Sequence, residues 1–217
     1  MRASDPQPPT PAKTVRNRRR AALATAATAA ALLVGASGTA AQAAPAGHGT
    51  ASRAASGYGG NLNFSELVQE QNQWCWAATG LSIAQYKGYG QNTSQNSFCL
   101  ASRGLSSGTC PNQPAELSVV QRGWRALGMS AGTEVNGGVN YATVQSEINA
   151  NRPLETGVYW TSGGGHARVI YGYNASAGTI LFSDPWPTNQ RYQEMNYNTY
   201  VSNSQFRWGG TVYRVGA

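Results

Sequence analysis

The pattern of the chain changes at Pro153, and this change limits the folds that are open to it. Before Pro153, apolar residues recur at helical spacing; after it, short β-rich runs alternate with turn residues. Helices first and strands afterwards indicate an α+β fold, in which a helical half packs against an antiparallel sheet. A cleft between two such halves is a natural place for a substrate.

Four segments before Pro153 have helical patterns. The first begins at Cys75, carries Ala77, Leu81 and Ala84 on one face, and stops at Gly88. Its small residues allow close packing, so we expect a central, buried helix. The other three helices are expected over 93–102, over 114–127 with Pro114 in the first turn, and over 140–150 with Asn140 as N-cap and Val144 and Ile148 facing inward.

Five β-rich runs follow Pro153, each bounded by turn residues. We expect strands over 155–160, 166–173, 179–184, 191–195 and 207–215.

Residues 1–43 have the three parts of a secretory signal peptide: a cluster of arginines at 16–20, an apolar stretch over 21–34 and "AQA" at 41–43. The apolar stretch is shorter than the roughly 20 residues that cross a bilayer. We therefore expect cleavage after Ala43, a secreted protein and no membrane partner. Residues 44–60 are small, polar and Gly-rich and predict a flexible lead-in, which leaves 61–217 as one domain.

Most of the positive charge lies in the leader. The remainder carries ten basic and eight acidic side chains, with no basic stripe, so nucleic acid is not an expected partner. No group of His, Cys and acidic residues has metal-ligand spacing. We expect no metal, no cofactor and a monomer.

The chain has three cysteines, an odd number for an exported protein. Cys99 and Cys110 bracket a polar loop that a disulfide could close, which would leave Cys75 unpaired, although other pairings are possible on paper. Cys75 lies between Trp74 and Trp76 at the start of the first helix. A free thiol in an oxidising compartment needs a reason, and catalysis is the usual one.

His166 is the one histidine of the folded part, because His48 lies in the lead-in. If 166–173 and 179–184 form a hairpin through "NASAG", the partner of His166 falls at 184 to 186, and Asp184 is there. A carboxylate beside the imidazole can fix its tautomer and stabilise the imidazolium.

Cys75 has the features of a nucleophile. The helix N-terminus and a nearby imidazolium both favour the thiolate. Its attack on a carbonyl would form an oxyanion, which amide N–H groups at the start of the helix and a side-chain amide could stabilise. The run "QEQNQ" offers Gln69, Gln71 and Gln73 for this role.

The segments "QEQNQWCWAA", "GGGHARVIYGY" and "SDPW" together resemble the papain-like cysteine proteases, and most closely the bacterial branch that includes the Avr-type effector proteases. The resemblance covers Gln69 to Trp186. It implies a papain-like fold with Cys75, His166 and Asp184 as catalytic triad and Gln69 as oxyanion donor. It also implies that Trp76 supports the site and that Trp186 shields the His–Asp hydrogen bond. The third member is Asp where papain itself has Asn.

The sequence therefore predicts a secreted thiol endopeptidase that acts on protein or peptide substrates. Two rival functions stay open. One is another acyl chemistry on the same triad, such as peptidoglycan amide hydrolysis, deamidation or transamidation; the other is an inactive secreted binding module. For single residues, ordinary packing is the alternative: a core position for Trp74, a solvated loop for Gln71 and Gln73.

Overall fold

The computed structural model describes residues 59–217. The expected signal peptide over 1–43, His48 and nearly all of the expected lead-in lie outside the described residues. Within the described part, no helix is both long enough and apolar enough to cross a membrane.

Residues 59–217 contain five helices, including the four that the sequence predicts. The first begins at Cys75, as expected, and ends shortly before Gly88. Asn140 caps the fourth helix, as predicted, by accepting a hydrogen bond from the Thr143 N–H at 2.8 Å. The helices are α1 (Cys75–Tyr86), α2 (Gln95–Arg103), α3 (Leu117–Ala126), α4 (Tyr141–Asn149) and α5 (Tyr197–Val201).

The start of α3 differs from the expectation that Pro114 lies in its first turn. The helix begins at Leu117, with Glu116 as its N-cap residue. The Arg103 side chain donates hydrogen bonds to the carbonyl oxygens of Gln113 and Pro114 at 3.0 Å each. These bonds hold the segment against α2, so Pro114 stays outside the helix.

The strands of the described residues all belong to one seven-stranded antiparallel sheet, which confirms the α+β class. The strand order is β2-β7-β3-β4-β5-β6, and β1 pairs with the C-terminal end of β4. The five predicted strands are present, and β1, β2 and α5 are additions that the sequence did not predict. The strands are β1 (Gly60–Asn61), β2 (Thr133–Asn136), β3 (Leu154–Trp160), β4 (Gly165–Asn174), β5 (Thr179–Ser183), β6 (Tyr192–Asn196) and β7 (Phe206–Tyr213).

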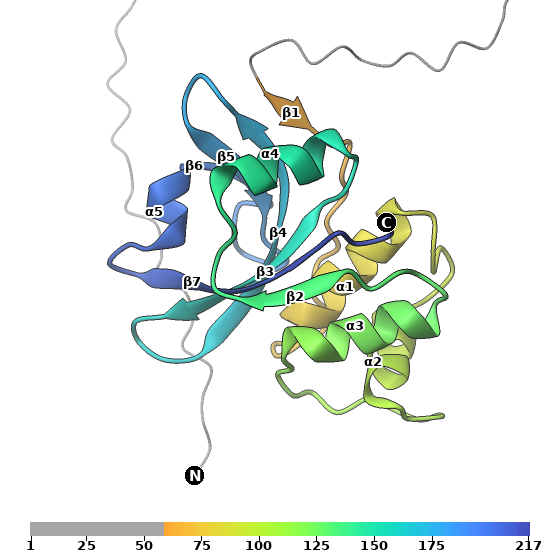
Figure 1. Ribbon diagram of the computed structural model, residues 1–217. Coiled ribbons are helices and arrows are strands. Elements are labelled where there is room, and N and C mark those ends of the chain that lie inside the picture. The colour runs from red at the N-terminus through yellow and green to blue at the C-terminus, as the bar shows by residue number, and fades with distance from the viewer. Residues whose placement is uncertain (1–58) are drawn as a thin grey trace, which may run out of the picture. The chain divides into compact units, whose positions relative to one another are not determined.

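Helices α1, α2 and α3 form the helical half, which α1 joins to the sheet by packing against β4 (Figure 1). The three helices approach closely because glycines face their neighbours. A Cβ on Gly80 of α1 would lie 2.5 Å from Val120 Cγ1 of α3, and the Trp124 indole of α3 donates its N–H to the Gly80 oxygen at 2.7 Å. Helix α1 is accordingly buried along most of its length, as predicted.

Helix α4 lies with the sheet and not with the helical half, although it precedes Pro153 in the sequence. It packs on β4 and β1, with Val144 and Ile148 buried as their spacing predicts (Figure 1). The Tyr141 hydroxyl ties its first turn to the β4–β5 hairpin by donating to the Asn174 oxygen at 2.9 Å.

A disulfide joins Cys99 of α2 to Cys110, with the two Cα atoms 6.0 Å apart. This confirms the expected pairing. Cys75 is the remaining cysteine, and its thiol is free.

Candidate active site

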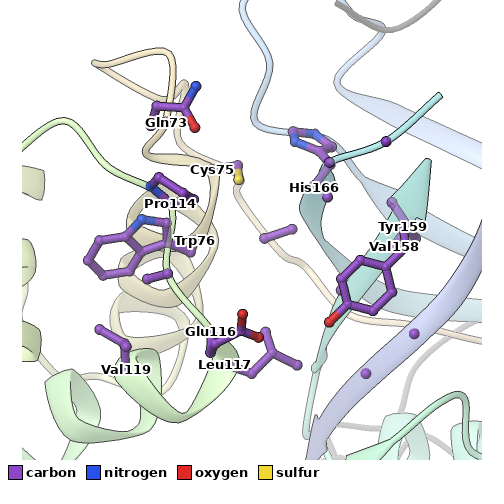
Figure 2. Close-up of a pocket in the computed structure, with 18 of the residues that line it drawn as sticks. Gln73, Cys75, Trp76, Pro114, Glu116, Leu117, Val119, Val158, Tyr159 and His166 are labelled. Carbon is purple, nitrogen blue, oxygen red and sulfur yellow. The ribbon is translucent and has the colours of Figure 1, made fainter. Parts of the chain in front are cut away.

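Cys75 is the first residue of α1 and is partly exposed. The first N–H groups of a helix have no intrahelical acceptor and carry the positive end of the helix dipole. The thiol therefore lies where backbone groups favour negative charge. Figure 2 shows the Cys75 sulfur on the helical wall of a cleft, facing the His166 ring on the opposite wall.

His166 is buried near the start of β4, where its main chain pairs with Val158 of β3. Its Nε2 lies 2.8 Å from Asp184 Oδ1. Nδ1 is then the ring nitrogen left for Cys75, so the tautomer is set by the carboxylate. The structure thus brings together the three side chains predicted from the sequence.

Asp184 directly follows β5, and its side chain has no exposed surface. Its Oδ1 accepts from the Trp186 N–H at 2.9 Å as well as from His166, and Oδ2 accepts from Arg168 Nε and Asn189 Nδ2, each at 3.1 Å. Burial by itself raises the pKa of Asp184, but His166, Arg168 and the Trp186 N–H together hold it well below its ordinary value. The carboxylate is therefore ionised at any physiological pH.

The pKa of His166 is raised from 6.5 to about 9. Burial lowers this pKa, and the charge and hydrogen bond of Asp184 outweigh the burial, with a smaller contribution in the same direction from Cys75. At neutral pH the ring is consequently an imidazolium, the form that stabilises a neighbouring thiolate.

Two tryptophans flank the His166 ring. Trp186 meets it edge-on with ring centroids 6.4 Å apart, and Trp160 at the end of β3 stacks on it at 6.1 Å. The Trp186 contact is the one that the resemblance implies. Trp160 was missed, because its proximity depends on the β3–β4 pairing; the aromatic end of the run "ETGVYW" was the available signal.

The cleft beside Cys75 and His166 has a volume of about 1130 Å³. One wall is the segment from Asn112 to Val119, and the other is formed by the β3–β4 hairpin. Glu116 and Glu134 also line it, and Figure 2 shows the Glu116 carboxylate reaching into the space toward Tyr159. A cleft of this size and shape can hold an extended peptide segment.

The amide run before Cys75 divides into buried and cleft-lining residues. Gln69 is 4% exposed, and its Nε2 donates to the Gln71 oxygen at 2.8 Å, while Gln73 lines the cleft. The Gln69 N–H also donates to the Pro185 oxygen at 3.0 Å, which fixes the run beside Asp184. A primary amide has two N–H groups, so one on Gln69 remains for an oxyanion. The oxyanion role of Gln69 stays a prediction.

The tryptophans beside Cys75 have structural partners. Trp74 is 2% exposed and donates its indole N–H to the Pro111 oxygen at 3.1 Å, so its place is in the core. Trp76 donates to the Gln113 oxygen at 3.1 Å and also lines the cleft. Within residues 59–217, no group of three or more His, Cys, Asp or Glu side chains is placed to hold a metal ion.

A cysteine that opens a helix in one half, facing a His–Asp pair on the sheet of the other half, defines the papain-like cysteine proteases as a class. The family model described as "Papain-like cysteine protease AvrRpt2" matches residues 60–205, and the chain belongs to this family of peptidases. No curated protein matches the chain.

Proposed function

We propose that this papain-like cysteine protease is a secreted endopeptidase that uses Cys75 as nucleophile, His166 as acid and base, and Asp184 as the group that orients His166. The observation that carries the proposal is the 2.8 Å contact between His166 Nε2 and Asp184 Oδ1, on the wall of the cleft opposite Cys75.

Acylation begins with a Cys75 thiolate and a His166 imidazolium. The sulfur attacks the scissile carbonyl carbon, and the π electrons move onto the carbonyl oxygen. His166 then gives its Nδ1 proton to the leaving amine as the C–N bond breaks, which leaves a thioester on Cys75. Asp184 holds the ring in place throughout by accepting from Nε2.

Deacylation repeats these steps with water. Neutral His166 takes a proton from the attacking water, the second tetrahedral intermediate collapses, and the C–S bond breaks to release the acid and regenerate the thiolate–imidazolium pair. The oxyanion of both intermediates would accept from the Cys75 N–H and from the second N–H of Gln69 Nε2.

Secretion rests on the leader pattern of residues 1–43 and is supported by the disulfide between Cys99 and Cys110, because such bonds persist in oxidising compartments. The proposed mature form is a monomer that takes protein or peptide substrates.

The test uses the exported protein with Cys75→Ala and His166→Ala beside the wild type. A thiol alkylator should label Cys75 in the wild type, and unfolded casein should be cleaved internally by the wild type alone. Undiminished casein cleavage by the Cys75→Ala variant would contradict the proposal.

Parallel assays with cell-wall fragments and with primary-amine incorporation separate peptide hydrolysis from the other acyl chemistries. N-terminal sequencing of the exported chain tests cleavage after Ala43.

A further inference from the structure

Arg168 is a charged residue inside the most buried strand of the sheet. It lies two positions after His166 on β4, so both side chains leave the strand on the same face. Arg168 is 6% exposed, and its neighbours on the strand from Ala167 to Tyr173 are all buried.

The guanidinium has one ionic partner and an aromatic enclosure. Arg168 Nε donates to Asp184 Oδ2 at 3.1 Å, on the oxygen that does not face His166. The guanidinium carbon lies 5.1–5.2 Å from the ring centroids of Trp160, Phe182 and Phe206. Rings at this distance stabilise a cation through their negative faces and leave it little room to move.

Stability by itself does not account for an arginine here. Taking a guanidinium out of water costs several kcal/mol, and an apolar side chain of similar volume often serves a core better than a buried ion pair. Arg168 Nη1 is moreover buried with no hydrogen-bond partner in the structure. Three aromatic rings could also enclose a methionine or leucine. An apolar residue could not, however, donate a hydrogen bond to Asp184 Oδ2.

We propose that Arg168 is a positioning residue that acts on catalysis through Asp184; this inference rests on the proposed function. By holding Oδ2, it keeps the carboxylate plane fixed so that Oδ1 points at His166 Nε2. Asp184 is thereby clamped from two sides, with one cation on each oxygen.

The two cations differ in what happens to them during the reaction. His166 loses its charge when it protonates the leaving amine, whereas an arginine in a protein stays charged. Asp184 therefore keeps one permanent cationic partner through the stage at which His166 is neutral. Because a small displacement of a catalytic group can lower the rate by about 100-fold, a fixed carboxylate matters for kcat.

The test compares Arg168→Met and Arg168→Lys with Arg152→Met, a matched control that breaks the ion pair between Arg152, just after α4, and Glu147 of α4, away from the cleft. The folded fraction of each variant is taken from its unfolding curve, so that kcat refers to folded protein. Arg168→Met should lower kcat by on the order of tenfold or more with KM nearly unchanged. Arg168→Lys should recover part of the loss because it keeps the charge, and Arg152→Met should lower the melting temperature and leave kcat unchanged.

A double-mutant cycle with Asp184→Asn tests whether Arg168 acts through Asp184. If it does, Arg168→Met adds little to the loss in the Asp184→Asn background, whereas independent effects multiply. Multiplied losses, or a kcat for Arg168→Met within twofold of wild type, would overturn the inference. Should Arg168→Met not fold, Arg168→Lys takes its place in the same cycle.

A readout that does not need peptide cleavage separates this inference from the proposed function. The rate at which a thiol alkylator labels Cys75 at neutral pH reports the thiolate that His166 stabilises. It should fall in Arg168→Met and stay unchanged in Arg152→Met. If the wild type cleaves no peptide, the proposed function fails, and the alkylation rates still decide the role of Arg168.

Discussion

The indole of Trp76 donates its N–H to the backbone oxygen of Gln113 at 3.1 Å, and Trp74 makes the same kind of bond to Pro111. The two tryptophans beside the nucleophile thus hold the segment that begins at Cys110 and forms one wall of the cleft. The disulfide anchors the start of this segment to α2. The position of the wall depends on both attachments.

Replacing both Cys99 and Cys110 with serine should therefore affect stability and substrate binding together. Loss of a crosslink across this short loop is expected to lower the free energy of unfolding by about 3 kcal/mol. KM should rise more than kcat falls, because the wall moves while Cys75 and His166 stay on α1 and β4. Urea unfolding and steady-state kinetics measure the two effects. If the variant and the wild type gave equal unfolding curves, the indole hydrogen bonds of Trp74 and Trp76 would be sufficient to hold the wall.

The raised pKa of His166 predicts an alkaline limit to activity. The ring should stay charged up to about pH 9, so kcat/KM should fall as the pH rises through that value, because neutral His166 has no proton to give to the leaving amine. Asp184→Asn removes the main cause of the raised pKa, so the limit should move down toward 6.5. NMR titration of the histidine ring signals checks this directly, because His48 is the one other histidine in the sequence whose signal must be told apart from that of His166. A His166 midpoint near 6.5 in the wild type would contradict the prediction.

The same pair makes stability depend on pH with a definite sign. A histidine whose pKa is raised on folding contributes stability that is complete below 6.5 and disappears as the pH rises through about 9. The contribution of Asp184 is complete above 3.8 and declines as the pH falls further, because its pKa is lowered on folding. Chemical unfolding at a series of pH values should show both losses, and Asp184→Asn should remove them.

Glu66 predicts a third dependence of stability on pH, which comes from the burial of a carboxyl group and not from an ion pair. Ser82 of α1 and Ser183 of β5 donate to its two oxygens at 2.9 and 2.6 Å. Burial raises its pKa from 4.5 to about 7, so its favourable contribution is complete below 4.5 and declines until about pH 7. Glu66→Gln should flatten this decline, which is on the order of 3 kcal/mol. Glu70→Gln, at an exposed position, is the control and should leave the profile unchanged.

The two carboxylates of the cleft predict a preference among peptides, because Arg103, which also lines the cleft, is held by the carbonyl oxygens of Gln113 and Pro114. Glu116 is the N-cap residue of α3 and makes no capping hydrogen bond; among residues 59–217 neither it nor Glu134 belongs to an ion pair. Burial and the charge of Glu116 raise the pKa of Glu134. A lysine or arginine near the scissile bond should therefore increase kcat/KM on the order of tenfold over norleucine.

A peptide library with a charged or neutral residue at each position measures this preference. The Glu116→Gln and Glu134→Gln double variant should lose the preference and cleave neutral peptides at the wild-type rate. Glu194→Gln, on β6 at the other edge of the sheet, makes the same charge change outside the cleft and should keep the preference. An unchanged preference in the double variant would show that other groups select the substrate.

Local sequence patterns predicted the elements that are stabilised locally. The apolar face of α4 and its Asn140 cap are formed by residues that are close together in the chain. The same is true of the hairpin that brings Asp184 to His166. The β4–β5 register shifts between Ile170 and Gly172, yet the carboxylate still reaches the ring. Turn geometry was sufficient because the loop between the strands is short.

Features that depend on distant pairing were not predicted. Strand β2 is short and polar, and it exists because β7, far along the chain, pairs with it. Helix α4 has the spacing of any amphipathic helix, which does not say which surface covers its apolar face. Arg168 is a different case: it was visible as a charge in the apolar run "HARVIYGY", two residues from His166, and the same β4–β5 hairpin that brings Asp184 to His166 also brings it to Arg168.

The place of β7 in the sheet has a consequence for biosynthesis. It is synthesised after the other six strands of this sheet, yet it lies between β2 and β3 and buries Val212 and, just beyond it, Val215. A chain truncated before Phe206 leaves two interior strand edges open, which favours aggregation over folding. The nascent polypeptide consequently cannot complete this sheet until β7 has been synthesised.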